Sequence, residues 1–247
     1  MSTRLLAVLS LAFACFLPLA HAAGPTGYLN DTGQTSCYKA DNTVGDCAVD
    51  AADSGDRPRQ DGRFGRDAKA GATPALTKTG GGAAGFDFSC VLWDGTVVHA
   101  TDCTTTLVAN TTATASGTPA TDWACTKDNH TNLIWSLQAV SFIDWTNATA
   151  TGDGSPIKAH NDASRCGFAD GWRVPTRREL LSIVHHGASN PAIDGAYFPG
   201  TVAAWYWSND AYAPDPADAW RVHFNDGDAY IAIKTLNLHV RLVRSGP

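Results

Sequence analysis

The chain has 247 residues, of which 44% are hydrophobic and 17% are charged, so it is long enough for one globular domain with an extension or for two small domains. Its 18 lysines and arginines are outnumbered by 24 aspartates and glutamates, which gives a formal net charge of −6 at pH 7. This balance argues against a general nucleic-acid-binding surface, and attraction to an anionic membrane or a sulfated glycan would need a local basic patch.

Residues 1–22 have the pattern of a signal peptide. Arg4 supplies a positive charge, residues 5–19 form an apolar run too short to span a bilayer comfortably, and residues 20–22 are Ala-His-Ala, a small-x-small cleavage site. Cleavage there would leave 17 basic and 24 acidic residues, a balance of 17 − 24 = −7. We therefore expect an exported protein, secreted, periplasmic or on the cell surface, without a transmembrane segment.

Six cysteines follow residue 22, and an even number in an exported chain predicts disulfide bonds. The pairing that we favour among many is Cys37–Cys47, Cys90–Cys103 and Cys125–Cys166. The first two bonds would close short loops, and the third would connect a strand to the segment before a helix. A zinc site is the alternative, but no Cys-x-x-Cys pair supports it. Cys15 lies inside the leader, where its neighbours fit a lipid-attachment motif poorly.

Residues 23–122 are rich in glycine, threonine and aspartate and contain few large apolar side chains. Such a segment buries little surface by itself, so we predict an irregular extension that is pinned by disulfides and packs on the domain that follows. A β-hairpin is expected within residues 86–105, where two apolar runs flank an Asp94-Gly95 turn.

Residues 123–247 are expected to open with a buried strand at 133–135, and helix signals follow it. Ser155 and Pro156 have the chemistry of an N-cap and a first helical residue, and this helix is expected to end near Arg165. A weaker helix is expected around residues 142–145.

A second clear helix start follows at Thr176. Glu179 lies three residues later and completes a capping box, and an apolar stripe then continues to Val184. Arg173 is expected to pair with a nearby carboxylate rather than to join a basic patch. We therefore assign structural roles to Thr176, Glu179 and Arg173.

Strand patterns occupy the rest of this half. Alternating or continuous apolar runs occur at residues 133–135, 205–207, 220–224, 229–233 and 239–244. Asn-Asp-Gly-Asp at 225–228 predicts a tight hairpin turn. Two helices followed by an antiparallel sheet indicate an α+β fold.

Several blocks carry a resemblance to a known family: GWRVPTRRELLSIV at 171–184, NPAIDGAYFP, YWSND, AWRVHFNDG and a terminal VRLVR. Together they resemble the bacterial DUF1566 family, also called the Lcl C-terminal domain family, over residues 127–244. The resemblance implies a C-type-lectin-like domain, at 123–247 by our boundaries, on an exported protein that binds a ligand. It does not imply one particular ligand.

The candidate ligand-binding residues are aromatic, turn and basic side chains of the strands: Trp205, Tyr206, Trp207, Trp220, Asn225, Asp226 and Arg241. Aromatic rings are common at binding surfaces, although the tryptophan pair at 205 and 207 can equally fill a core. Asn225 and Asp226 have the alternative role of forming the hairpin turn. No catalytic motif is recognisable, and Glu179, which the capping box already uses, is the only glutamate in the chain.

These features favour a non-catalytic binding module of the cell exterior, such as an adhesin that recognises a glycan or a protein, with no metal, no cofactor and no nucleic-acid partner. A structural subunit of a pilus, fibre or envelope assembly is the second hypothesis, and it leaves room for self-association. An oxidase related to the formylglycine-generating enzymes is the third, because those enzymes share the broad fold and depend on reactive cysteines.

Overall fold

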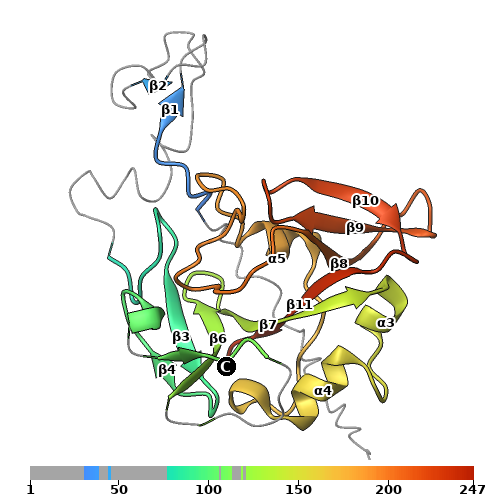
Figure 1. Cartoon of the computed structure of the whole chain (residues 1–247), viewed down its shortest axis with the longest axis horizontal. Helices are drawn as coiled ribbons and strands as arrows, with labels where there is room; N and C mark the ends of the chain where they lie inside the picture. Colours follow the sequence, from blue (N-terminus) through green and yellow to red (C-terminus); the bar gives the residue numbers. More distant parts are fainter. Residues whose placement is uncertain (1–30, 39–43, 46–76, 106, 113–117, 119–120) are drawn as a thin grey trace, which may run out of the picture.

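The computed structural model describes residues 31–38, 44–45, 77–105, 107–112, 118 and 121–247 (Figure 1). The predicted signal peptide lies outside these residues. Nine strands of the described part form one sheet: β3 (Phe88–Leu92), β4 (Val97–Val98), β5 (Val108–Ala109), β6 (Asp122–Asp128), β7 (Leu133–Ile143), β8 (Trp205–Ala211), β9 (Asp218–His223), β10 (Ala229–Ile233) and β11 (Leu238–Ser245).

The strands lie in the order β10-β9-β8-β11-β7-β6-β3-β4, with β5 paired to β6. Neighbours are antiparallel except for the β8–β11 and β5–β6 pairs, which are parallel. A separate small hairpin consists of β1 (Cys37–Tyr38) and β2 (Val44–Gly45). The described helices are short: η1 (Cys103–Thr105), α3 (Trp145–Thr149), α4 (Pro156–Asp162), η2 (Arg165–Gly167) and α5 (Arg177–Leu181). The prediction of an antiparallel-dominated sheet with few helices is confirmed.

Both faces of the sheet are covered. One buried cluster contains Tyr206, Val222 and Phe224 together with Leu180 of α5. The other contains Trp207, Leu242 and Ile134 together with residues of α3 and α4. Because successive side chains of a strand point to opposite faces, neighbours such as Tyr206 and Trp207 enter different clusters. In Figure 1, α3 and α4 lie together beyond one side of β8 and β11, and α5 lies near β8 and β9.

The predicted helix starts are confirmed, but the helices are shorter than expected. Ser155 caps α4 and accepts a hydrogen bond from the Lys158 amide, and Pro156 is the first helical residue. The helix ends at Asp162 rather than near Arg165, because Ser164 adopts a left-handed backbone conformation with φ of 46°.

Helix α5 ends at Leu181 rather than at Val184. Beyond it, the His185 amide donates to the Ala192 carbonyl and the His186 amide donates to the Thr32 carbonyl. These long-range backbone bonds direct the chain away from the helix axis. Both histidines therefore lie beyond the end of the helix.

The weak helix expected around residues 142–145 is also misplaced. Strand β7 continues to Ile143, and the helix, α3, begins at Trp145. Asp144 is its N-cap and accepts a hydrogen bond from the Asn147 amide.

The hairpin predicted within residues 86–105 is present as β3 and β4, and it is part of the large sheet, because β3 pairs with β6. Phe86 and Phe88 also enter the same core cluster as Tyr206. Strands from both sides of residue 122 therefore share one sheet, and the boundary placed there stays a prediction.

Two of the three predicted disulfides are confirmed, Cys90–Cys103 and Cys125–Cys166. All four of these cysteines are fully buried. Cys37 is also disulfide-bonded, whereas Cys47, its predicted partner, lies outside the described residues. No helix within the described ranges is long and apolar enough to cross a membrane.

Candidate functional site

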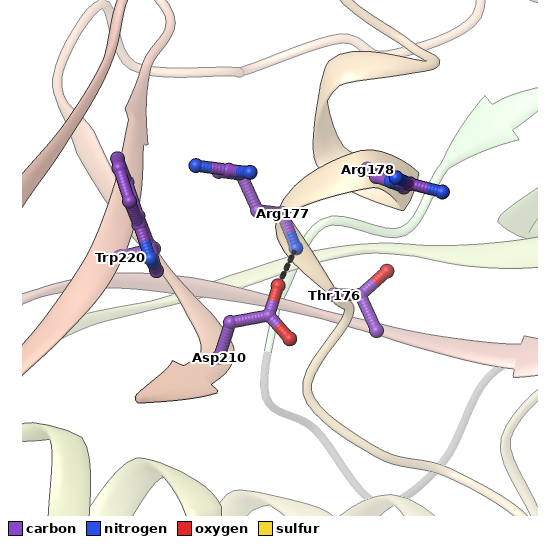
Figure 2. A pocket seen from close by; sticks show the side chains of 5 residues that line it. All are labelled: Thr176, Arg177, Arg178, Asp210 and Trp220. Carbon is purple, nitrogen blue, oxygen red and sulfur yellow. Dashed lines mark hydrogen bonds between the residues drawn. The ribbon is translucent and has the colours of Figure 1, made fainter. Parts of the chain in front are cut away.

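A surface pocket of about 380 Å³ lies between the start of α5 and strands β8 and β9 (Figure 2). Its walls come from Thr176, Arg177 and Arg178 on one side and from Asp210 and Trp220 on the other. Contacts of α5 with both β8 and β9 hold the two walls together. The pocket thus combines two guanidinium groups, one carboxylate, one hydroxyl and one indole ring.

The helix wall is held in place by the capping box. The Thr176 amide donates to Glu179 Oε2 over 2.7 Å, and the Glu179 amide donates to Thr176 Oγ1 over 3.2 Å. Arg173 donates to both carboxylate oxygens of Glu179, over 2.7 and 2.5 Å. The capping box and the carboxylate partner of Arg173 that the sequence led us to expect are both present.

The charge of Glu179 is kept despite burial of its side chain. Burial alone would raise the pKa of this carboxyl, but hydrogen bonds from Arg173 and from Thr176 outweigh it and hold the pKa below its ordinary value. The anion and its bidentate arginine therefore hold the start of α5, which forms one wall of the pocket.

The strand wall is connected to the helix by Asp210. Its Oδ2 accepts a hydrogen bond of 2.6 Å from the Arg177 amide, as the dashed line in Figure 2 shows. Nearby, the Asn209 amide donates to the Pro175 carbonyl over 2.7 Å. These two bonds join β8 to the segment that enters α5, so the pocket is a built feature of the tertiary structure.

Trp220 forms the apolar side of the pocket. Its indole is half-buried, and the Arg177 guanidinium lies 4.0 Å from the ring centroid. Tyr212 meets the same indole edge to face at 5.7 Å. A cation over the face of a tryptophan is attracted by the ring electrons, so the Arg177 charge is positioned at the pocket instead of extending freely into solvent.

Neither pocket arginine forms an ion pair with a carboxylate of the described residues. Figure 2 shows the Arg177 guanidinium directed toward Trp220 and the Arg178 guanidinium directed away from it. Arg178 is exposed. The pocket consequently presents two positive charges against the single carboxylate of Asp210.

The part of the chain that builds this pocket matches a known protein family. Residues 124–244 match the sequence model of the Lcl C-terminal domain. This region belongs to the Lcl C-terminal domain family. The match confirms the resemblance seen in the sequence blocks, and no curated protein matches the chain.

Within the Lcl C-terminal domain, the predicted tryptophans divide between two faces of the sheet. Trp205 lies opposite His223 and stacks on it at 4.4 Å, and the Arg221 guanidinium is 3.9 Å from its ring. His223 and Arg221 alternate with Trp220 on β9, so Trp205 and Trp220 lie on opposite faces. They do not form one binding surface.

Three predicted ligand-binding residues of the Lcl C-terminal domain are buried in its core, so the structure contradicts a surface role for Tyr206, Trp207 and Arg241. Tyr206 and Trp207 are enclosed because both faces of the sheet are covered. Arg241 donates to the Ser136 carbonyl over 2.7 Å and to Thr201 Oγ1 over 2.8 Å. Burial lowers the pKa of Arg241, while these acceptors replace the water that its charge has lost.

The structure gives Asn225 and Asp226 a place in the β9–β10 turn, which is the alternative that the sequence left open. The His223 amide donates to the Asp228 carbonyl, and the Gly227 amide donates to the His223 carbonyl. Gly227 has a φ of 89°, a conformation that favours glycine. Asp226 Oδ1 accepts from the Asp228 amide over 3.2 Å and contacts the His223 ring.

The sequence identified Trp220 and Thr176 but missed Asp210 as a site residue. Arg177 and Arg178 could have been found from the sequence, since two arginines directly follow the helix cap. Asp210 could not have been, because it lies 33 positions from Arg177 and meets it only after β8 packs against α5.

Proposed function

We propose that this chain is an exported, non-catalytic binding module with a C-type-lectin-like domain. The pocket between the start of α5 and strands β8 and β9, called the α5–β9 pocket below, holds an acidic group of a ligand outside the cell in this proposal. The ligand class that we favour is a glycan with carboxylate or sulfate groups. Export rests on the predicted signal peptide at residues 1–22 and agrees with the buried disulfides, which persist in oxidising compartments.

The observation that carries the proposal is one pocket lined by two arginines and an indole, in which the Arg177 guanidinium lies 4.0 Å from the Trp220 ring centroid. Arginine donates to carboxylates and sulfates through two parallel hydrogen bonds. Sugar rings present an apolar face that stacks on tryptophan. An acidic sugar would use both kinds of contact, with its apolar face against Trp220 and its acidic group against Arg177.

The disulfides weigh against the oxidase hypothesis. Cys37, Cys90, Cys103, Cys125 and Cys166 are disulfide-bonded, so none of these five offers a thiolate for chemistry. A binding role agrees better with sulfurs that are committed to crosslinks.

The test is a glycan array followed by titration calorimetry on the purified mature chain. We expect Trp220→Ala to weaken binding of an acidic glycan at least about tenfold, because a buried ring contact and the position of Arg177 are both lost. Raising the salt concentration should weaken binding further, since the arginines contribute electrostatically.

Trp205→Ala is the matched control, because it removes another half-buried tryptophan from the opposite face of the sheet. It should leave binding unchanged. Equal losses in both variants, or binding only to neutral ligands, would contradict the proposed pocket. A purified chain that turns over a substrate and binds nothing on the array would contradict the binding function.

A further inference from the structure

Strand β10 is one end of the nine-stranded sheet. It pairs with β9, and no strand of the described residues pairs with its other side. In Figure 1 it forms the outer border of the β8–β10 region. Its backbone groups on that side are available to another strand.

The register identifies which residues face the open side. Tyr230 lies opposite Arg221 and Ala232 opposite Ala219, and flanking hydrogen bonds join Asp228 to His223 and Lys234 to Ala217. Bonded and non-bonded pairs alternate in an antiparallel ladder, so residues 228, 230, 232 and 234 bond to β9. The N–H and C=O groups of Ala229 and Ile231 and the N–H group of Ile233 therefore point outward, while the Ile233 carbonyl accepts a hydrogen bond from the Leu236 amide in the turn that follows.

This edge lacks the features that usually prevent pairing with another chain. Residues 229–233 are Ala-Tyr-Ile-Ala-Ile, with no charge and no proline. The exposed fraction is 64% for Tyr230 and 49% for Ile233. The other end of the sheet is different, because β4 has only two residues and offers little backbone to a partner.

Charges lie at both ends of β10 in a self-complementary arrangement. Asp228 precedes the strand, and Lys234 follows it, with its ammonium 2.8 Å from the Pro216 carbonyl and 4.2 Å from the centroid of the Trp145 ring. If two copies of β10 align antiparallel with Ile231 on the two-fold axis, Ala229 lies opposite the partner's Ile233 and Asp228 lies opposite the partner's Lys234. Residues of opposite charge therefore lie across from each other at both ends of the pair, and Ala229, Ile231 and Ile233 of each copy fall in the hydrogen-bonding register.

We propose that this edge is a homodimer interface, in which the β10 strands of two copies pair antiparallel about Ile231. The interface is isologous, since the same residues contribute from both copies. Ile231 meets its own counterpart, and Tyr230 lies across from the partner's Ala232. The two sheets then continue into one another.

The pairing also places the two α5–β9 pockets on one face, a consequence that rests on the proposed function. Trp220 lies opposite Ile231, so both side chains are on the same face. Three strand spacings separate the two Trp220 positions, which is about 14 Å. Two pockets at this separation could hold two groups of one glycan chain and raise its apparent affinity.

The first test is sedimentation velocity of the purified mature chain, without ligand, from about 1 to 500 µM, a range that reaches weak association. We expect a reversible dimer. Ile233→Lys places a charge in the open edge and should weaken the dimer at least about tenfold, since each dimer contains the altered contact twice. Val108→Lys is the matched control, because it adds the same charge at a 65% exposed apolar position on β5, and it should dimerise like the parent.

The second test measures the formation of a covalent dimer instead of the loss of a reversible one. Residues opposite each other in a bonded antiparallel pair have Cα atoms about 5.5 Å apart, within disulfide range. Ile231→Cys should therefore form a covalent dimer on oxidation. Tyr230→Cys should not, because its counterpart is displaced by two residues along the partner strand.

A strict monomer over the whole concentration range would overturn the interface. Equal dimerisation of the Ile233→Lys and Val108→Lys variants would overturn it as well, as would stronger crosslinking at residue 230 than at residue 231. Because no ligand is present, these outcomes are independent of whether the pocket binds a glycan.

Discussion

His160 shows at the residue scale how the core uses polar groups. The ring is buried, with Nε2 3.0 Å from Ser136 Oγ and Nδ1 2.9 Å from the Pro156 carbonyl. A carbonyl only accepts, so Nδ1 carries the proton and Nε2 accepts from the serine hydroxyl. Burial, and secondarily the positive charge of Arg165, lowers the pKa of His160 to about 4. The neutral ring thus connects α4 to β7.

Because the pKa of His160 is lowered in the folded protein, we expect the protein to lose stability in mild acid. Between its ordinary pKa of 6.5 and the folded value of about 4, only the unfolded chain binds the proton, so stability falls as pH falls through this window. The contribution from His160 between pH 7.5 and pH 5 is about 2 kcal/mol. Denaturant unfolding at both pH values should show that His160→Gln loses less stability on acidification than the parent. An equal loss in both proteins would assign the acid sensitivity to other groups.

Residue-level predictions of the site succeeded only where local chemistry decides the outcome. Strand alternation correctly separates Tyr206 from Trp207, but it does not reveal that helices cover both faces and bury both rings. Arg241 is a charged strand residue that sequence reasoning placed on the surface. Its burial depends on acceptors at Ser136 and Thr201, which are distant in the chain.

At the scale of the element, the start of α5 was predictable and its end was not. Thr176 and Glu179 are three residues apart, so the capping box is a local feature of the sequence. The end depends on the bonds that residues 185 and 186 make with Ala192 and Thr32. Helix starts that rely on a cap can be inferred from sequence, whereas ends that rely on tertiary partners cannot.

The pair of Arg173 and the buried carboxylate of Glu179 should contribute strongly to the stability of this helix. Glu179→Ala leaves the Thr176 amide and Arg173 without their acceptor, and we expect it to cost about 2–4 kcal/mol of unfolding free energy. Glu179→Gln retains one acceptor oxygen and should cost less. Urea unfolding measures both differences.

An exposed ion pair of similar geometry is the control for this prediction. Lys158 and Asp162 lie 2.6 Å apart on α4, and the two pairs differ in the carboxylate, which is 62% exposed in Asp162 and 3% exposed in Glu179. Solvent and salt screen such pairs, so Asp162→Ala should leave the unfolding midpoint unchanged within error. If it destabilised the protein as much as Glu179→Ala, burial would not be the cause of the larger effect.

At the scale of the whole molecule, the class of fold was predictable and its topology was not. Alternating apolar patterns located the strands of the carboxy-terminal half and their hairpin turn. They contain no information on the parallel contact of β11 with β8, or on the position of β3 beside β6. Those neighbours are chosen by packing over long sequence separations, which a local pattern does not encode.

The two disulfides connect the parts of this sheet over different distances, and the difference predicts their contributions. Cys125–Cys166 joins residues 41 positions apart, and Cys90–Cys103 joins residues 13 positions apart. In the chain-entropy account, a longer closed loop restricts the unfolded chain more, which gives about 4 kcal/mol for the first bond and about 3 kcal/mol for the second.

Replacing each pair by two alanines tests this account. All four sulfurs are fully buried, so the packing losses should be similar and should largely cancel in the comparison. Urea unfolding without reductant should show that Cys125→Ala with Cys166→Ala costs about 1 kcal/mol more than Cys90→Ala with Cys103→Ala. A reversed order would mean that the bonds act through the folded state, and that the link from β6 to η2 matters less than the link between β3 and η1.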